Sequence, residues 1–220
     1  MGVDRHAAEG FGRAAAAYER GRPGYPQAAI DWMVAQLGIR PDSTVVDLGA
    51  GTGKFSRMIH ATGARVMAVE PVAAMRVELA RAAPGVDVLD GTAEAIPCAD
   101  ASADAVTAAQ AFHSFNGAAA LSEIHRVLRP AGGLGLIWNR RDTRDPRQAA
   151  IDAIIRPYRR RAPTHERDQW REPMLASTLF RPADERRFRH EQTVDLDGLI
   201  DRVLSIRLPY LTDVLLFRRR

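Results

Sequence analysis

The chain has 220 residues, of which 46% are hydrophobic and 26% charged, an ordinary balance for a soluble domain with one sizeable core. No run of eighteen apolar residues occurs, and the N-terminal stretch lacks the apolar segment of a secretory signal, so we expect neither a membrane span nor export. Cys98 is the only cysteine, so we expect no internal disulfide and a cytoplasmic protein.

The net charge of +4 is unevenly distributed along the chain. Residues 1–139 carry 12 basic and 14 acidic residues, whereas residues 140–220 carry 19 and 13. A basic C-terminal portion suits a partner such as nucleic acid or an acidic small molecule. However, the basic residues are nearly all Arg throughout the chain, and those near the C-terminus alternate with acids, which is typical of a solvent-exposed surface.

The first elements predicted along the chain are two helices. Residues 5–20 form the first helix, and two prolines and two glycines interrupt the pattern at 20–26. Residues 27–37 form the second helix, because Ile30 and Met33 fall on one apolar face.

From residue 44 onward, short apolar runs alternate with helical segments. Strands are predicted at 44–48, 65–70, 86–89, 104–109 and 133–138, and helices at 54–62, 72–83 and 117–128. This alternation predicts an α/β fold, a doubly wound Rossmann-like sheet that is mostly parallel and has helices on both faces. Ligands of such sheets bind beyond the carboxyl ends of the strands, where the strand order reverses.

The pattern changes after residue 139. We expect an Arg-rich helix at 145–161, an irregular polar segment at 163–182 anchored by Trp170 and Phe180, a strand at 186–194, a helix at 196–205 and a last strand at 208–217. The late strands are expected to form an antiparallel edge of the sheet. We therefore divide the chain into an N-terminal helical cap (1–40), a Rossmann-like core (41–142) and a C-terminal portion that completes the sheet and the substrate side (143–220).

A glycine-rich loop follows the first strand of the predicted sheet. Residues 45–53, "VVDLGAGTG", hold three glycines at alternate positions. A phosphate-binding loop requires Gly-Lys-Ser/Thr, whereas Gly53-Lys54 is followed here by Phe55. A dinucleotide fingerprint requires its third glycine at position 54, which is Lys. Both of these ligand classes therefore fit the loop poorly.

A third ligand, S-adenosylmethionine, has no phosphates and requires close approach of the backbone together with a carboxylate for the ribose hydroxyls. Glu70 ends the second predicted strand nineteen residues after Gly51, near the spacing of about twenty expected of a ribose-binding acid. Together with "AVEP" at 68–71, the loop resembles the first two motifs of the class I S-adenosylmethionine-dependent methyltransferases.

The resemblance extends over much of the chain. Residues 90–115 and 123–142 are similar to the methyltransferase type 11 group, and "FGRAAAAYERGRPGYP" (11–26) is similar to the branch that includes the trans-aconitate methyltransferases. The match is continuous over 11–142 and weak over 206–217. It implies a methyltransferase with S-adenosylmethionine as its cofactor and a small-molecule acceptor, of which a carboxylate is one candidate.

The resemblance also implies roles for individual residues. Asp47, Gly49, Gly51 and Thr52 line the methionine and ribose parts of the cofactor, and Glu70 accepts hydrogen bonds from the ribose hydroxyls. The alternatives are an ordinary tight turn for the glycines and a helix N-cap for Glu70. Asp47 lies within an apolar strand, where an unpaired carboxylate is costly, so we expect a partner to compensate it.

Further cofactor contacts are implied at Pro71, Met75, Thr92, Ala93, Glu94, Gln110, Tyr18 and Arg22. Met75 fits a core position nearly as well, and Glu94 fits a capping acid equally well. Tyr18 and Arg22 suit a carboxylate of the cofactor or of an acidic substrate, whereas a packing tyrosine and a surface arginine explain them equally.

His113, in the segment "QAFHSF" after the fourth strand, is the candidate catalytic residue, because its ordinary pKa of about 6.5 suits a general base. A neutral structural histidine fits as well, and methyl transfer requires no base when the acceptor is already ionised. The histidines lack metal-ligand spacing, so no metal is expected.

Two departures from the related branch favour an alternative without catalysis. That branch usually carries Trp where this chain has Ser114, and this chain is shortened near Arg207. A relative that binds the cofactor without turnover therefore remains a hypothesis. The basic C-terminal portion favours a different alternative, a nucleic-acid methyltransferase, although no base-methylation motif follows the fourth strand.

Overall fold

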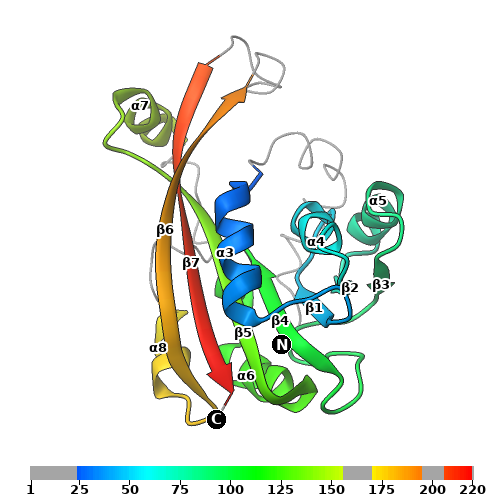
Figure 1. The fold of residues 1–220 in the computed structure, drawn as a ribbon. Helices are drawn as coiled ribbons and strands as arrows, with labels where there is room; N and C mark the ends of the chain where they lie inside the picture. The colour runs from blue at the N-terminus through cyan, green and yellow to red at the C-terminus, as the bar shows by residue number, and fades with distance from the viewer. Residues whose placement is uncertain (1–23, 156–169, 195–205, 220) are drawn as a thin grey trace.

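The computed structural model describes residues 24–155, 170–194 and 206–219 (Figure 1). These residues form a seven-stranded sheet with the strand order β3-β2-β1-β4-β5-β7-β6. The strands are β1 (Thr44–Leu48), β2 (Arg65–Val69), β3 (Asp87–Leu89), β4 (Ala103–Ala109), β5 (Leu128–Arg141), β6 (Phe180–Val194) and β7 (Ile206–Arg219). Among the described helices, none is long and apolar enough to cross a membrane.

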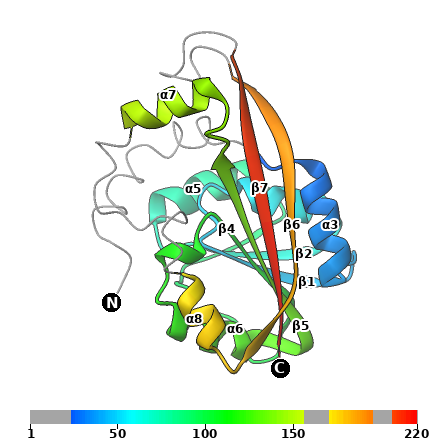
Figure 2. The same cartoon turned by 90° about the vertical axis from the view of Figure 1, so that its left-hand side faces the viewer.

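The sheet is mostly parallel, as the sequence predicts. Strands β1 to β5 pair in parallel, and β7 pairs antiparallel with both β5 and β6. Strand β6 therefore runs in the direction of β1 to β5 and forms the edge, with the antiparallel β7 inserted between it and β5 (Figure 2). The predicted fold class is confirmed, and the structure adds the order of the last two strands.

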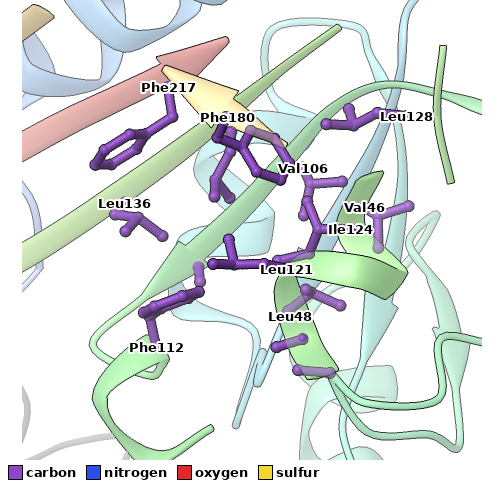
Figure 3. Close-up of a cluster of buried hydrophobic side chains, with 14 of the residues drawn as sticks. Val46, Leu48, Val106, Phe112, Leu121, Ile124, Leu128, Leu136, Phe180 and Phe217 are labelled. Atoms are coloured by element: carbon purple, nitrogen blue, oxygen red, sulfur yellow. The ribbon is translucent and has the colours of Figure 1, made fainter. Parts of the chain in front are cut away.

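Helices cover both faces of the sheet. They are α3 (Gln27–Leu37), α4 (Lys54–His60), α5 (Ala73–Ala82), α6 (Gly117–Val127), α7 (Pro146–Ile155) and α8 (Arg171–Ala176), with a short 3₁₀ turn η1 (Phe112–Ser114). On one face, α3 and α4 share a core with Val45, Ile137 and Val214. On the opposite face, α6 and α8 pack over β1, β4, β5 and β7, and Figure 3 shows Leu121 and Ile124 of α6 within this cluster.

Helix α3 is amphipathic in the way that the sequence predicts. Ala29, Ile30 and Met33 are fully buried, because residues three and four apart lie on one face of a helix. Gly38 ends the helix in the left-handed conformation at φ +70°, where glycine has no Cβ penalty. The helix shares a core cluster with five strands of the sheet, and the division of the chain at residue 40 stays a prediction.

The prediction of an irregular segment at 163–182 is wrong at 171–176 and from residue 180 onward. Residues 171–176 form α8, and β6 begins at Phe180. Trp170 and Met174, four residues apart, are both buried and place α8 on the sheet. Local propensity misses this short helix, since a helix of six residues depends on tertiary packing for its stability.

The remaining differences concern the ends of elements. Strand β5 begins at Leu128 and ends at Arg141, beyond both ends of the predicted 133–138, because its pairing continues along β4 and β7. Strand β6 is likewise longer than the predicted 186–194, since β7 pairs with all of it. The helices predicted at 5–20 and 196–205 lie outside the described residues, and the helix predicted at 145–161 is described only as far as Ile155.

Candidate cofactor and acceptor site

The glycine loop turns sharply at the carboxyl end of β1. Gly49, Gly51 and Gly53 have φ values of +64°, +59° and +82°, a region that favours glycine. The backbone N–H groups of Gly49 and Ala50 both donate to the Val69 carbonyl, at 2.9 and 3.2 Å. These two hydrogen bonds hold the loop against the end of β2.

The three glycines differ in what surrounds them. A Cβ at Gly49 would lie 2.7 Å from the Cβ of Ala111, and one at Gly53 would lie 2.8 Å from Leu79 Cγ. A Cβ at Gly51 would meet no atom within 4 Å. Gly49 and Gly53 therefore permit close packing inside the protein, whereas Gly51 faces open space in which a ligand can approach the backbone.

Glu70 connects the end of β2 to this loop. Its Oε2 accepts a hydrogen bond from the Gly51 N–H at 2.9 Å, and its Oε1 accepts one from the Val72 N–H at 2.9 Å. Burial raises the pKa of Glu70, although the hydrogen bonds from Val72 and Gly51 and the charge of Arg76 lower it. A carboxylate has about four acceptor positions, so two remain for another donor.

The helix-start alternative for Glu70 stays open beside the ribose role, because Glu70 accepts the hydrogen bond of the N–H of Val72, the N-cap of α5. Arg76 binds the backbone of Glu70. Its Nη1 donates to the Glu70 carbonyl at 2.8 Å, and its Nη2 donates to Asp90 Oδ2 at 2.8 Å. Arg76 thus joins the carboxyl ends of β2 and β3, the strands that precede Glu70 and the predicted cofactor contact Thr92.

Asp47 is fully buried, and its two partners are hydroxyl groups. Ser56 Oγ donates to Oδ2 at 2.6 Å, and Thr107 Oγ1 donates to Oδ1 at 3.0 Å. Desolvation is the main cause that raises the pKa of Asp47 from 3.8 to about 6; the hydroxyls oppose it and the charge of Glu70 adds to it. The expected compensation is therefore present as two hydroxyl groups, and their hydrogen bonds link β1 to α4 and β4.

Sequence analysis did not identify Ser56 and Thr107 as the partners of Asp47. Thr107 gave a signal, because it is a polar residue inside the apolar run of β4, where it is fully buried. Ser56 gave a weaker one, since a serine in the first turn of a helix is common. From sequence alone, neither residue can be distinguished from an ordinary surface hydroxyl. Only the tertiary contacts of α4 and β4 with β1 identify them.

The loop after β3 packs against the start of α6. Glu94 Oε1 accepts a hydrogen bond from the backbone N–H of Asn116, the N-cap of α6, at 2.8 Å. Ala93 is buried at 4% exposure, and Thr92 forms an isolated bridge with Ala95. The capping alternative for Glu94 is therefore supported, and the cofactor contacts of these three residues stay predictions.

Gln110 and His113 follow β4. Gln110 has a φ of +58°, its N–H donates to the Ile137 carbonyl at 2.9 Å, and its Nε2 donates to the Asn139 carbonyl at 3.1 Å. Trp138 Nε1 donates to His113 Nδ1 at 3.3 Å. In a neutral ring whose Nδ1 accepts, the proton lies on Nε2. This geometry favours His113 as a hydrogen-bond donor over a general base, and its catalytic role stays a prediction.

The other predicted contacts are also placed, with two exceptions. Thr52 and Met75 are buried at 2% and 3% exposure, and Pro71 lies before the N-cap of α5. Tyr18 and Arg22 lie outside the described residues. Within residues 24–155, 170–194 and 206–219, no group of three or more His, Cys, Asp or Glu residues is arranged to hold a metal ion.

The predicted residues that the structure describes lie at or just beyond the carboxyl ends of β1, β2, β3 and β4. The strand order reverses between β1 and β4, which is where ligands bind in open α/β sheets. The residues present fit a nucleoside with vicinal hydroxyls, because Gly51 faces open space and the Glu70 carboxylate beside it keeps two acceptor positions.

Comparison with known proteins decides the family of this part of the chain. Residues 46–136 match the family model described as a methyltransferase domain. The chain contains a class I S-adenosylmethionine-dependent methyltransferase domain. S-adenosylmethionine is the cofactor of such a domain, in agreement with the fit at Gly51 and Glu70.

Two relatives show how much of the chain is shared. An uncharacterized methyltransferase of Mycobacterium tuberculosis is 51% identical over 134 residues, which are 61% of this chain and 54% of the relative. An uncharacterized methyltransferase-like protein of Schizosaccharomyces pombe is 41% identical over 156 residues, 70% of this chain and 61% of the relative. The matched segments thus span little more than half the length of these relatives.

Solved structures share the fold of the methyltransferase domain. A structure titled for the conversion of a disulfide bond into a thioacetal group during echinomycin biosynthesis has a TM-score of 0.65 at 18% identity, covering 97% of this chain and 93% of its own. Geranyl diphosphate methyltransferase in complex with GPP and sinefungin has a TM-score of 0.58 at 17% identity, covering 88% and 77%. At these identities the comparison shows the fold alone.

Proposed function

We propose that this protein transfers the methyl group of S-adenosylmethionine to a small-molecule acceptor that carries a carboxylate. The observation that carries the proposal is the pairing of Glu70 with Gly51, because it places an acceptor-rich carboxylate beside a backbone that faces open space. We assign the protein to the branch that includes the trans-aconitate methyltransferases on residues 11–26, and place it in the cytoplasm on its single cysteine.

In this proposal, the residues of the chain bind the cofactor and orient the acceptor. The two remaining acceptor positions of Glu70 bind the ribose hydroxyls, and the loop held to Val69 keeps Gly51 in place. When bound, the cofactor supplies a methyl group on a sulfonium that is already electrophilic. The task left to the protein is therefore to orient the acceptor in line with that methyl group.

His113 remains the candidate catalytic residue. With Nδ1 accepting from Trp138, the neutral ring carries its proton on Nε2. An N–H at that position suits a hydrogen bond to an acceptor oxygen, which orients the acceptor without removing a proton. An ionised carboxylate needs no base, so this role agrees with the proposed acceptor class.

The nucleic-acid alternative has weaker support. Arg144 pairs with Asp142 at 2.5 Å and Arg147 pairs with Asp145 at 2.8 Å, so acids neutralise arginines of the basic C-terminal portion. The alternative without catalysis rests on Ser114 and on the shortening near Arg207. A turnover measurement separates it from the proposed enzyme.

Calorimetry with S-adenosylmethionine tests the cofactor half of the proposal. We expect the wild type to bind and Glu70→Ala to bind about tenfold more weakly or worse, since two hydrogen bonds to a charged group are lost. Glu172→Ala, an exposed acid on α8, is the matched control and should bind like the wild type. A folded wild type that does not bind would contradict the proposal.

Transfer of a labelled methyl group tests the other half. Carboxylates are offered first, followed by amines, phenols and short nucleic acids. Methylation of a carboxylate supports the proposal, and methylation of RNA or DNA alone replaces it with the nucleic-acid alternative. Tight cofactor binding without turnover on any acceptor supports the relative without catalysis.

A further inference from the structure

A buried carboxylate lies between two guanidinium groups on the sheet, outside the residues assigned to the cofactor. Asp213 of β7 has a side chain that is 5% exposed. Arg140 Nε of β5 lies 2.7 Å from Asp213 Oδ2, and Arg187 Nε of β6 lies 2.5 Å from Asp213 Oδ1. The three residues come from three neighbouring strands (Figure 2).

The charges of this triad do not cancel. One guanidinium is enough to neutralise a buried carboxylate, so the second leaves a net charge of +1. Both arginines approach Asp213 through Nε, which leaves their Nη groups outside the pair. Within the described part of the chain, the Nη atoms of Arg140 and Arg187 form no hydrogen bond or ion pair, and their side chains are 32% and 53% exposed.

The triad lies on the same face of the sheet as Trp138, the hydrogen-bond partner of His113. Trp138, Asp213 and Arg187 are register partners across β5, β7 and β6, so their side chains share one face. Arg140 lies two residues beyond Trp138 on the same face, nearer the carboxyl end of β5.

A continuous set of contacts leads from the glycine loop to the triad. Ala111 packs against Gly49, His113 lies two residues after Ala111, and the His113 ring binds Trp138 at 3.3 Å. Trp138 is fully buried and stacks on Trp170 with ring centroids 4.4 Å apart. Trp138 is the register partner of Asp213, so the buried carboxylate of the triad borders this aromatic pair, where charge interactions are less screened than in open water.

Other charged groups near the triad do not remove its excess. Glu185 precedes Arg187 by two residues and raises the pKa of Arg187, whereas Arg144 lowers it. The ion pair of Glu185 in the described residues is with Arg171, at 3.9 Å. Arg144 itself is paired with Asp142. A second carboxylate placed against the Nη groups would therefore meet unpaired donors.

We propose that Arg140 and Arg187, held by Asp213, bind a carboxylate group of the methyl acceptor. A guanidinium offers two parallel N–H donors to a carboxylate. Before the ligand arrives, Asp213 orients Arg187 through a hydrogen bond and attracts Arg140 through an ion pair. This inference rests on the proposed function, because it names the residues that select its acceptor. In a purely structural role, the triad would join three strands without affecting any ligand.

Calorimetric titrations of acetate, succinate and citrate, each paired with its uncharged amide, test the proposal, with and without S-adenosylhomocysteine. We expect wild-type protein to bind at least one carboxylate and none of the amides. Arg187→Gln and Arg140→Gln should weaken that binding by about tenfold or more. Arg186→Gln is the matched control, because it removes the same charge from the neighbouring position on the opposite face of the sheet. It should change the affinity for the carboxylate less than twofold.

Each result has a definite meaning. Carboxylate binding that is equal in Arg187→Gln and Arg186→Gln, or absent in a folded wild type that binds S-adenosylhomocysteine, overturns the proposal. Loss of S-adenosylhomocysteine binding in Arg187→Gln assigns the triad a structural role and also overturns it. A wild type that binds no S-adenosylhomocysteine contradicts the proposed function instead, because the carboxylate titration without cofactor still reports on the arginines.

Discussion

At the scale of single residues, two buried carboxylates have different tasks. Glu70 receives its hydrogen bonds from backbone N–H groups of the loop and keeps acceptor positions for a ligand. Asp47 receives its hydrogen bonds from Ser56 and Thr107 and holds α4 and β4 together beneath the loop. Asp47 thus joins β1 to the helix that follows the glycine loop.

The raised pKa of Asp47 predicts how stability changes with pH. Because the folded state binds this proton with a pKa of about 6 instead of 3.8, charged Asp47 opposes folding above pH 6 and this effect vanishes below pH 4. Asp47→Asn removes the titration. Relative to the wild type, the variant should therefore gain about 3 kcal/mol of unfolding free energy between pH 4 and pH 7.

Urea unfolding of both proteins across this pH range measures the difference. Ser56 and Thr107 keep a partner in the variant, since an amide both donates and accepts hydrogen bonds. A difference between the two proteins that stays constant with pH would show that Asp47 titrates normally in the folded state.

At the scale of elements, the sequence predicts the strands and long helices of the core well and α8 badly. Strand β1 was predicted at 44–48 and is found there, because a buried parallel strand is a short, continuous apolar run. The six-residue helix α8 has no periodic pattern long enough to detect. It forms because Trp170 and Met174 are buried against the sheet and α6.

Trp170→Ala should therefore destabilise the protein by about 3–5 kcal/mol, because a large aromatic side chain leaves a cavity over Trp138. Leu175→Ala, on the same helix but with a side chain that is 74% exposed, is the matched control and should change stability by about 0.5 kcal/mol or less. Chemical denaturation gives both values. Equal effects of the two substitutions would mean that α8 is not anchored by Trp170.

Some contacts of the candidate site could be predicted from the sequence and others could not, and the difference has a physical reason. The contact between Gly51 and Glu70 could be predicted, because neighbouring parallel strands end on the same side of the sheet. Residues that follow two such strands at the usual spacing therefore lie close together. Ser56, Thr107 and Trp138 were missed because each is recognised only by its partner from another element. The triad of Arg140, Arg187 and Asp213 was missed for the same reason.

At the scale of the whole molecule, several arginines in the described part of the C-terminal portion are paired with acids. Asp142 and Asp145 neutralise Arg144 and Arg147, and Asp213 contacts two arginines. Net charge alone suggests a surface for nucleic acid, but affinity for phosphates depends on arginines that are free to displace counterions.

We expect short single-stranded RNA to bind with a Kd of about 10⁻⁵ M or weaker at physiological salt. Fluorescence anisotropy at low and physiological salt measures it. The double variant Asp142→Asn and Asp145→Asn, which leaves Arg144 and Arg147 unpaired, should bind more tightly and with a steeper salt dependence. Strong binding by the wild type would restore the nucleic-acid alternative.

The sequence by itself determined the α/β architecture, the glycine loop with its acid at the end of the second strand, and the class of the cofactor. These features depend on periodicity and on spacing between adjacent strands, which are local along the chain. Only the tertiary structure decided the partners of Asp47, the hydrogen bond of His113 and the three-strand triad around Asp213. Those contacts join residues far apart in sequence, and their energies depend on burial that no local pattern records.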